Sequence, residues 1–546
     1  MPEKENRRIH PRIFVNQVGY CPGQVKTAVV PASMDSFIVK DAKTGKIVFT
    51  GAASSPAYWE MSGDTVRIAE FSSLTAPGSY FISGASQASG SYPFDIKAGL
   101  YEDLASAALK AFYFNRTYIP IEERYGGKWA RAAGHPDTVV IVHESAASAH
   151  RKAGDIISAP YGWYDAGDYN KYVVNSAITC WTLMSFYETF DAARDMTFDI
   201  PEQGGAMPDL LDEIYFNLRW AIRMQDEDGG VYHKLTAKNF EPFVMPDKAV
   251  SPRYVVQKST AATLDFAAIM AQASRVYRPY MPEFSSQCLE AAKKAWLWAQ
   301  QNPDILYQQP ADITTGAYGD DNLEDEFVWA GIELYISTKD PEYLENVDLR
   351  ALKPGHPQWA DVLFLGIVSL AVNETDFPAE AAVAREKIMA YADMLYDKYL
   401  SNPFRISLDF FRWGSNSDVA IQGMFKLLAH RFSGEDRYLA SALSDLDYLL
   451  GKNPTGYCYV TGFGARRAMN IHHRPSAADG VEDPVPGFLV GGPNLATFED
   501  CPDDDRSRLP AKSFVDLVCS YSTNEIAINW NAPFFYLAAG LNAACK

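Results

Sequence analysis

The chain lacks the features that several large protein classes require. No apolar run reaches the roughly 18 residues of a membrane-spanning helix, and the run Leu363–Val372 is far too short. The 49 Lys and Arg against 68 Asp and Glu leave a net charge of −19 over 546 residues, which argues against nucleic acid or an anionic membrane as the main partner. A GxSxG elbow, a GxxxxGK[ST] loop, an HExxH pair and a strand-borne GxGxxG are all absent. The enzyme classes that depend on these motifs are therefore excluded.

Cysteine and targeting signals are also sparse. The seven Cys residues are widely spaced, odd in number and contain no CxxC pair, so we expect neither a disulfide framework nor a Cys-rich zinc site. The first residues, MPEKENRRIHPR, have no apolar stretch of the kind a signal peptide needs. We expect a protein that is either cytoplasmic or has lost its signal segment.

Hydrophobic and aromatic residues, by contrast, are plentiful. Hydrophobic residues make up 47% of the chain and aromatic residues 13%. This composition excludes global disorder and supplies a large core. The aromatic share fits either that core or a surface on which flat ligands such as sugar rings stack.

Residues 12–97 have the pattern of a small β-domain. Short β-prone runs alternate there with turns rich in Gly, Pro, Ser and Asp, at roughly ten-residue spacing, which predicts a β-sandwich preceded by a tail over residues 1–11. The expected strands are Ile13–Val18, Thr27–Val30, Phe37–Lys40, Lys46–Thr50, Thr65–Glu70, Gly78–Ile82 and Ser91–Ile96.

Residues 98–546 instead show helical periodicity, with apolar residues at three- and four-residue steps. A mostly α domain of about a dozen helices is typical of an α/α toroid, although no clean sequence repeat is visible. The helices are expected at residues 101–115, 170–190, 207–225, 259–277, 283–301, 324–338, 359–372, 377–399, 416–432, 436–451 and 524–543.

The first motif with chemical potential is GWYDAGDYNKY, which ends at Tyr172. Asp165 and Asp168 lie three residues apart around a flexible Ala-Gly, flanked by aromatic residues and just before an expected helix. Asp168 fits the N-cap of that helix. It also fits a general base, because a helix N-terminus keeps a carboxylate ionised.

The second motif is YSTNEIAINWNAP, in which Glu525 opens an otherwise apolar helix. A first-turn Glu favoured by the helix dipole is one interpretation. The polar residues around it favour a functional site, because a pure core segment would not contain Asn524, Asn529 and Asn531.

Two further loops are rich in polar side chains. The segment Asn470–Ser476 contains two adjacent His and an Arg, which fit hydrogen bonding to hydroxyl groups better than chelation of a metal. The segment Thr314–Glu326 gathers hydroxyl and carboxylate oxygens around Gly residues. This second loop fits either a Ca²⁺ site or a solvated acidic loop.

Together these motifs resemble glycoside hydrolase family 9, which consists mainly of cellulases. WYDAGDYNKY, the HHR loop and NEIAINWNAP match its hallmarks in the same order, and the resemblance covers nearly the whole chain. The run Ile13–Tyr20 is similar to the start of the immunoglobulin-like module that precedes the catalytic domain in one branch of the family.

The resemblance implies an (α/α)6 barrel and hydrolysis of β-1,4-glucosidic bonds with inversion, without a cofactor for the chemistry. It implies Glu525 as general acid, Asp168 as general base and Asp165 as a residue that helps hold the attacking water. Sugar contacts are implied for His472, His473, Arg474 and Tyr521. The aromatic residues expected as stacking platforms are Trp163, Tyr164, Tyr169 and Trp530.

The resemblance also bears on metals and localisation. Relatives often carry structural calcium, which here would bind to Thr315, Gly316, Asp320, Asp325 and Glu326. Zinc is not expected, because the segment Gly134–Asp137 keeps a His and an Asp but no Cys lies between Cys21 and Cys180. Asp516 is followed by Leu517, whereas many relatives have two adjacent acids there. The family suggests a secreted or periplasmic enzyme.

Three functions remain open from the sequence. An endo-β-1,4-glucanase leads, and soluble glucans are the expected substrate because no cellulose-binding module follows Leu541. An exo-acting cellodextrinase or exo-β-glucosaminidase is the alternative enzyme. A non-catalytic glycan-binding protein is the third, and the intact trio Asp165, Asp168 and Glu525 argues against it.

Overall fold

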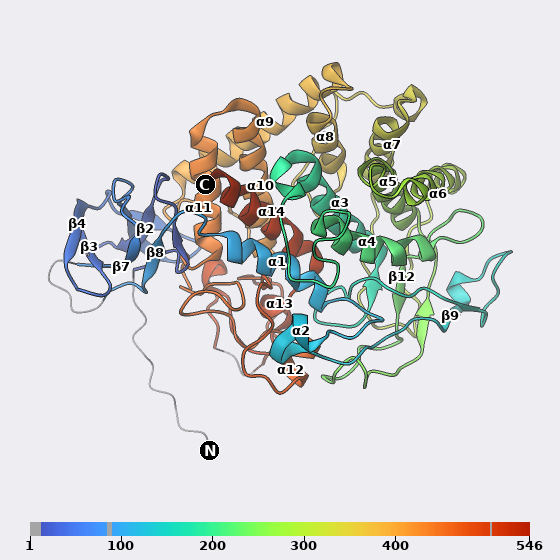
Figure 1. Cartoon of the computed structure of the whole chain (residues 1–546), viewed down its shortest axis with the longest axis horizontal. Helices are drawn as coiled ribbons and strands as arrows, with labels where there is room; N and C mark the ends of the chain where they lie inside the picture. The colour runs from blue at the N-terminus through green and yellow to red at the C-terminus, as the bar shows by residue number, and fades with distance from the viewer. Residues whose placement is uncertain (1–12, 85–89, 503–504, 546) are drawn as a thin grey trace.

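The computed structural model describes residues 13–84, 90–502 and 505–545, so the predicted tail over residues 1–11 lies outside it. The N-terminal part of the described chain forms two β-sheets, with strand orders β1-β8-β7-β3-β4 and β2-β6-β5, around an apolar core of its own. This arrangement confirms the predicted β-domain, which lies beside the helices in Figure 1. Its strands are β1 (Gly19–Tyr20), β2 (Thr27–Pro31), β3 (Ser36–Asp41), β4 (Ile47–Ala52), β5 (Ala57–Trp59), β6 (Asp64–Glu70), β7 (Gly78–Ser83) and β8 (Phe94–Ile96).

The predicted strand Ile13–Val18 is wrong, apart from a single bridge between Phe14 and Val29. This segment reaches across to the helical domain: the Gln17 amide donates to the carbonyl of Leu450 at 2.9 Å, and Asn16 Nδ2 donates to Asp447 Oδ1 at 2.9 Å. Hydrogen bonds that a sheet neighbour would have taken therefore join the two domains.

The remaining described chain is the (α/α)6 barrel. Its inner helices are buried on nearly every side: α3 (Val173–Thr189), α5 (Thr260–Val276), α7 (Glu324–Thr338), α8 (Leu363–Val372), α10 (Ser415–Ser433) and α14 (Ile528–Ala544). Outside them lie the other long helices: α1 (Glu102–Phe114), α4 (Asp209–Ala221), α6 (Pro282–Gln301), α9 (Pro378–Ser401) and α11 (Asp436–Leu449).

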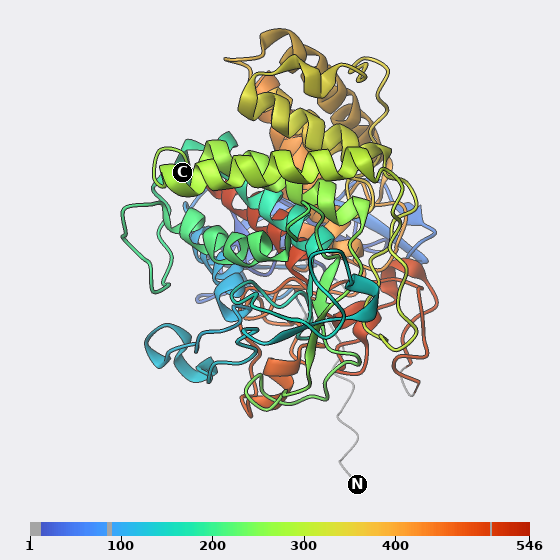
Figure 2. The ribbon, with the colours of Figure 1, turned by 90° about the vertical axis from the view of Figure 1, so that its right-hand side faces the viewer.

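Loops, short helices and a third sheet gather at one end of the barrel, as Figures 1 and 2 both show. The sheet has the strand order β10-β9-β13-β12-β11. These elements are β9 (Val140–Val142), β10 (Ile156–Ile157), β11 (Lys171–Tyr172), β12 (Lys234–Thr236), β13 (Arg253–Val255), α2 (Glu123–Gly126), α12 (Arg474–Ala478) and α13 (Tyr521–Asn524).

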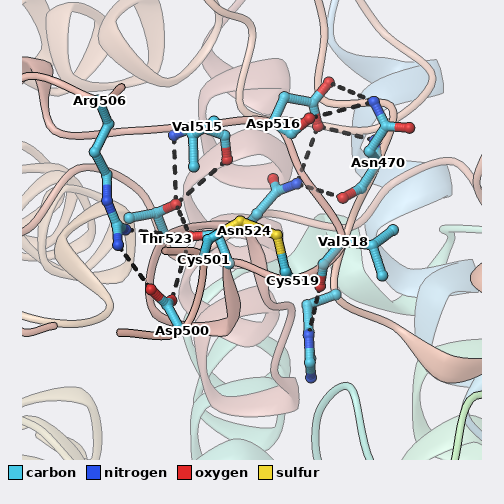
Figure 3. Close-up of a disulfide and its surroundings, with 12 residues drawn as sticks. Asn470, Asp500, Cys501, Arg506, Val515, Asp516, Val518, Cys519, Thr523 and Asn524 are labelled. Carbon is cyan, nitrogen blue, oxygen red and sulfur yellow. Dashed lines mark hydrogen bonds and ion pairs between the residues drawn. A yellow bond between two sulfur atoms is a disulfide. The ribbon is translucent and has the colours of Figure 1, made fainter. Parts of the chain in front are cut away.

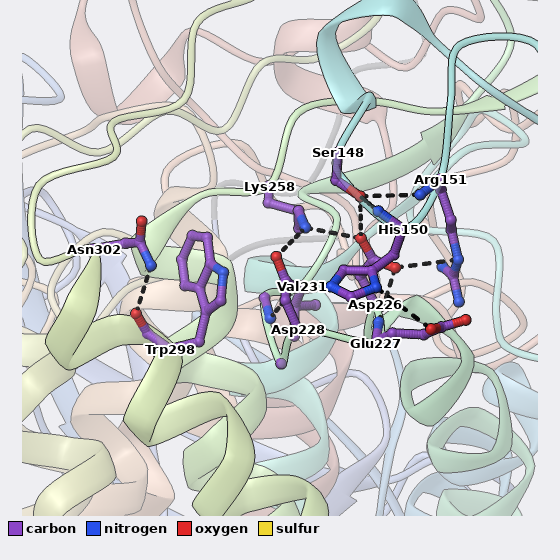
Figure 4. Close-up of polar contacts among 12 residues, drawn as sticks. Ser148, His150, Arg151, Asp226, Glu227, Asp228, Val231, Lys258, Trp298 and Asn302 are labelled. Atoms are coloured by element: carbon purple, nitrogen blue, oxygen red, sulfur yellow. Dashed lines mark hydrogen bonds and ion pairs between the residues drawn. The ribbon is translucent and has the colours of Figure 1, made fainter.

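The turn that leads into β12 is fixed by an ion-pair cluster (Figure 4). The buried carboxylate of Asp226 accepts from Lys258 Nζ at 2.8 Å and from Ser148 Oγ at 2.9 Å, and it pairs with Arg151 Nε at 3.1 Å. Lys258 also pairs with Asp228 at 2.7 Å. Because each charge is compensated within the cluster, the turn holds the following strand in place beside the motif loops.

The joint between the two domains corrects the expectation of no disulfide. Cys21 is bonded to Cys545 at the end of α14, 524 residues away in sequence. Trp59 packs against Phe404 and Phe411 of the barrel, with ring centroids 5.2 and 5.9 Å apart. The spacing of Cys residues could not reveal this pair, because only the docking of the β-domain brings the two ends of the chain together.

Candidate active site

The aspartate motif lies in a turn, not at a helix N-terminus. Lys171 and Tyr172 form β11, which pairs with β12 through Lys171 and Leu235, so the chain is extended there and α3 starts only at Val173. The N-cap interpretation of Asp168 is therefore wrong. Its carboxyl group is held by side chains and not by a helix N-terminus.

The glutamate motif is corrected in the same way. Glu525 follows the short helix α13, and α14 begins only at Ile528. The segment between them is extended and forms bridges from Glu525 to His472 and from Ile526 to Val490. Glu525 therefore faces the HHR loop from a β-like segment, and its charge is not set by a helix N-terminus.

The two motifs meet although they are far apart in the sequence. The Gly167 amide donates to Glu525 Oε1 at 3.2 Å, and the Ile528 amide donates to the carbonyl of Asp165 at 2.9 Å. A Cβ on Gly167 would lie 2.1 Å from the carbonyl oxygen of His472, so only glycine allows this approach. The structure thus brings Asp165, Asp168 and Glu525 together.

One carboxylate oxygen of Asp168 accepts hydrogen bonds, and the other accepts none from the described residues. Its Oδ2 accepts from Asn170 Nδ2 at 2.5 Å and from the hydroxyl of Tyr172 at 3.1 Å. Its Oδ1 is buried and has no hydrogen-bond partner among the described residues. A carboxyl group with one oxygen held by donors and the other free is the arrangement that a general base needs in order to take a proton from water.

Asn170 is itself held in one orientation. Its Oδ1 accepts from Thr236 Oγ1 at 3.0 Å, from the Ala237 amide at 3.0 Å and from Arg253 Nη1 at 3.3 Å. An amide whose oxygen is taken by donors must present its NH₂ group elsewhere, here to Asp168.

Asp165 differs from Asp168 because both of its oxygens are taken. Oδ1 accepts from Asn175 Nδ2 at 2.7 Å, and Oδ2 accepts from the hydroxyl of Tyr318 at 2.8 Å. Burial, followed by the charge of Asp168, raises the pKa of Asp165 to about 8. It fits a residue that positions its neighbours better than one that exchanges protons with substrate.

Glu525 has the environment of an acid. Burial, and next the negative charge of Asp168, raise the pKa of Glu525 well above its ordinary value of 4.5. The raised pKa favours the protonated form of this carboxyl group, which is the form that a general acid needs.

The HHR loop contributes one half-buried and two buried side chains. His472 is half-buried and lies edge-on to Tyr521, with ring centroids 5.9 Å apart. Arg474 donates through Nη1 to the carbonyl of Gly167 and through Nε to that of Glu241, both at 2.7 Å. His473 is buried, and burial lowers its pKa to about 3. His472 and Tyr521 can reach a ligand at the surface, whereas sugar contacts by His473 and Arg474 stay predictions.

The predicted stacking platforms are largely wrong. Trp163 is 1% exposed and donates through Nε1 to Glu213, and Tyr164 and Tyr169 are equally buried in a small aromatic cluster. Trp530 is half-buried. The aromatic residue that the sequence did not single out is Trp413, which is 41% exposed and lies 5.4 Å from the ring of Tyr521.

A second disulfide, again contrary to expectation, supports the segment that carries Glu525 (Figure 3). Cys501 is bonded to Cys519, beside the buried ion pair of Asp500 and Arg506 at 2.7 Å. Asp500 Oδ2 also accepts from the Ser522 amide at 2.9 Å. These contacts fix the chain immediately before the acid.

Asp516 ties the same segment to the HHR loop (Figure 3). Its Oδ1 accepts from the Asn470 amide at 2.8 Å and from Asn524 Nδ2 at 3.0 Å, and its Oδ2 accepts from the Met469 amide at 2.9 Å. The carboxylate of Asp516 therefore connects the two loops. The neighbouring Leu517 is exposed.

The predicted calcium ligands separate into two groups. Lys234 Nζ donates to Thr315 Oγ1 at 3.0 Å and to the carbonyl of Gly316 at 2.6 Å, so an ammonium group already occupies these two oxygens and the prediction is wrong for them. The predicted ligands Asp320, Asp325 and Glu326 instead lie near Asp265, where burial, followed by the charges of Asp325 and Asp320, raises the pKa of Asp265 well above its ordinary value.

These carboxyl groups have unsatisfied oxygens. Both oxygens of Asp265 and of Glu326, and Oδ2 of Asp320, are buried without a hydrogen-bond partner in the described chain. Burial, and next the charge of Asp265, raise the pKa of Glu326 to about 11. Yet no group of three or more His, Cys, Asp or Glu within the described ranges has an arrangement that would hold a metal ion. The unsatisfied carboxyl oxygens are suitable ligands for a cation, but they are not arranged as a preformed binding site.

The segment Gly134–Asp137, in which zinc is not expected, is held by two cationic side chains. The carboxylate of Asp137 pairs with Lys171 Nζ at 2.7 Å and with Arg253 Nε at 3.1 Å, and all three side chains are buried. Nδ1 of the adjacent His135 is hydrogen-bonded to the hydroxyl of Tyr164 at 2.7 Å.

Comparison with known proteins agrees with this fold. The model of glycosyl hydrolase family 9 matches residues 101–538, and the model of the cellulase N-terminal ig-like domain matches residues 8–89. The xyloglucan-specific endo-β-1,4-glucanase BoGH9A of Bacteroides ovatus is 44% identical, over 97% of this chain and 94% of that protein. Endoglucanase D of Acetivibrio thermocellus is 33% identical, over 98% and 84%. A solved structure, Bacteroides ovatus GH9, superposes with a TM-score of 0.90 at 42% identity and covers 98% of this chain and 99% of its own. No described helix is long and apolar enough to cross a membrane.

Proposed function

Because the chain belongs to glycoside hydrolase family 9, and so is a glycoside hydrolase, we propose that it is an inverting endo-β-1,4-glucanase with Glu525 as general acid and Asp168 as general base. The observation that carries this proposal is the contrast between the two carboxyl groups. The pKa of Glu525 is raised, whereas Asp168 is held by two donors on one oxygen and has its other oxygen buried and free among the described residues.

In the proposed reaction a water molecule attacks the anomeric carbon from the face opposite the leaving group. Asp168 takes one proton from that water, the bond from the anomeric carbon to the glycosidic oxygen breaks, and Glu525 gives its proton to the departing oxygen. One proton is taken and one is given, so the enzyme returns to its starting state after proton exchange with solvent. Asp165, anchored by Asn175 and Tyr318, would help to hold the water.

Xyloglucan is the first substrate to test. The relative that shares 44% of its residues over nearly the whole chain is named as specific for it. The alignment covers 97% of this chain, so it spans both the β-domain and the helical domain. We therefore expect a soluble, branched β-1,4-glucan to be hydrolysed faster than crystalline cellulose.

Product analysis decides between this proposal and its alternatives. The purified chain is incubated with tamarind xyloglucan, carboxymethyl-cellulose, cellohexaose and chitosan oligomers, and reducing ends and product lengths are measured, with Glu525→Gln as the control. Rapid loss of polymer length and an α-anomer as the first product, seen by NMR, are expected. Release of single terminal units would indicate an exo-acting cellodextrinase, or an exo-β-glucosaminidase if only chitosan is cut. Binding without hydrolysis would leave a glycan-binding protein.

We further propose that a structural calcium ion compensates the carboxyl groups of Asp265, Asp320, Asp325 and Glu326. Support comes from their buried unsatisfied oxygens and from the preference of Ca²⁺ for carboxylate ligands. A bound ion would stabilise the folded state by mass action without entering the reaction. Melting with EGTA and then with restored Ca²⁺ tests this. An unchanged melting temperature, together with no bound calcium by elemental analysis, would show that protons alone neutralise the cluster.

The two disulfides support a location outside the cytoplasm, because such bonds persist in oxidising compartments. We propose that the enzyme is secreted or periplasmic. Thiol titration of protein isolated under alkylating conditions would detect four additional free thiols if the bonds do not form in the cell.

A further inference from the structure

The loop between β12 and β13, residues 238–252, presents two aromatic rings to solvent beside the active site. Phe240 is 47% exposed and Phe243 is 40% exposed. On its inner side the same loop is fixed, because Val244 and Ala249 pack against Tyr164 and Tyr169. The loop is therefore anchored in a way that leaves both Phe rings outside the core.

Two hydrogen bonds from active-site residues hold this loop. The hydroxyl of Tyr169 donates to the carbonyl of Val244 at 2.5 Å, and Arg474 Nε donates to the carbonyl of Glu241 at 2.7 Å. The guanidinium of Arg474 also lies 5.5 Å from the ring centre of Phe240 and 5.2 Å from that of Phe243. Arg474, which also contacts Gly167, therefore packs against both Phe rings.

The rings continue a row of surface side chains that passes the catalytic acid. Phe243 lies edge-on to His472 with ring centroids 5.2 Å apart, His472 lies 5.9 Å from Tyr521, and Tyr521 lies 5.4 Å from Trp413. His472 is bridged through its backbone to Glu525. Glu525 therefore lies beside the middle of a row whose two ends are Trp413 and the Phe240–Phe243 pair.

We propose that Phe240 and Phe243 form a further binding platform for the substrate, which takes the apolar faces of sugar units of a long β-1,4-glucan beyond those at the scissile bond. The inference rests on the proposed function. Rigid, half-exposed aromatic rings bury apolar sugar faces at low entropic cost, and hydrophobic rings fixed at the edge of a catalytic site mark a binding surface more often than a defect of packing.

If the platform binds distant sugar units, its loss should weaken the hydrolysis of long substrates and leave that of short substrates nearly unchanged. The loss of one aromatic contact, in Phe243→Ala, should raise KM for xyloglucan or cellohexaose by up to about tenfold, with kcat nearly unchanged. Turnover of an aryl β-cellobioside, which is too short to span the row, should stay within about twofold of wild type. Phe240→Ala should act in the same direction.

Val250→Ala is the matched control, because Val250 lies in the same loop and is 82% exposed. It should leave both substrates unaffected. Binding of xyloglucan by Glu525→Gln, with and without Phe243→Ala, is then measured by calorimetry as a readout independent of turnover.

The outcomes separate the two proposals. If wild type hydrolyses no glucan, the proposed function fails. If wild type is active and Phe243→Ala behaves like Val250→Ala on every substrate, the platform is overturned. If kcat falls equally on long and short substrates, the rings serve only to support Arg474 and the turn at Gly167, and the platform is likewise rejected.

Discussion

The proposed roles of Glu525 and Asp168 can be separated by the choice of leaving group. Glu525→Gln keeps the side-chain volume and an oxygen that can accept from the Gly167 amide, as Oε1 does at 3.2 Å in wild type. The variant removes only the transferable proton. A glycosidic oxygen of a natural glucan leaves poorly without that proton, whereas a 2,4-dinitrophenolate leaves readily without one.

The expected magnitudes follow from this difference. General acid catalysis contributes about 10²–10⁴-fold, or roughly 3–5 kcal/mol of barrier, so Glu525→Gln should lose that much kcat on xyloglucan. On 2,4-dinitrophenyl β-cellobioside the loss should be less than about tenfold. Asp168→Asn should lose about 10²–10⁴-fold on both substrates, because water must be deprotonated whatever group departs.

The pH profile provides an independent measurement. Burial and the charge of Asp168 raise the pKa of Glu525, so wild-type activity should fall on the alkaline side as this group loses its proton. With the activated substrate, Glu525→Gln should lack that alkaline limb. Circular dichroism melts establish that each variant is folded. Equal losses on both substrates for Glu525→Gln, or more than about a tenth of wild-type turnover on xyloglucan, would refute the assignment of the acid.

Four more predictions concern neighbouring features. Asp165→Asn should lower kcat on xyloglucan severely but less than Asp168→Asn, since Asp165 orients water without taking its proton; an equal or larger loss would argue against this order. Asn170→Ala should lower kcat about tenfold or more with KM unchanged, because hydrogen bonds to charged groups are worth about 1.5–3 kcal/mol; a change in KM alone would contradict a role in positioning the base. Removal of residues 12–97, proposed as structural support, should lower the melting temperature by exposing apolar surface at the joint, and an isolated segment that binds cello-oligosaccharides would oppose that role. In EGTA the free energy of unfolding, followed by denaturant titration, should fall as pH rises above about 4.5, since the folded state keeps the proton of Glu326 up to a pKa of about 11; a rise over that interval would show the sign to be wrong.

Periodicity in the sequence was sufficient for most of the secondary structure. The helix expected at residues 324–338 is α7 with the same bounds, and that expected at residues 283–301 differs from α6 by one residue. Apolar residues at three- and four-residue steps define such helices locally. The strand β5 was not predicted, because three residues offer too little alternation to be recognised.

Tertiary contacts account for what periodicity could not predict. The expected helices at residues 170–190 and 524–543 start late, at Val173 and Ile528, because β11 and the bridges of Glu525 keep the preceding residues extended. Both helix-dipole arguments failed for that reason. In both motifs the local tendency to form a helix was overridden, because the residues pair with segments that are distant in sequence.

The positions of the aromatic side chains likewise depend on tertiary contacts that the sequence pattern does not show. Trp163 and Tyr169 flank the two aspartates in sequence, yet they point into the core, while Phe243, Tyr521 and Trp413 come from three separate segments to form the exposed row. Sequence proximity to a catalytic residue therefore predicted aromatic contacts poorly. Only the arrangement of loops at one end of the barrel shows which rings a polymer can reach.

The three carboxyl groups show how neighbours, and not residue type, assign chemical roles. Asp165 and Asp168 share a residue type and a turn, but the first has donors on both oxygens and the second on one. An oxygen that already accepts from a rigid amide cannot easily take a proton from water, so only Asp168 is suited to do so. Burial of Glu525, and next the charge of Asp168, favour its protonated form, and the single backbone donor at Oε1 opposes this only in part. The base therefore helps to keep the acid protonated, and removal of the charge of Asp168 should weaken the acid function as well as the base function.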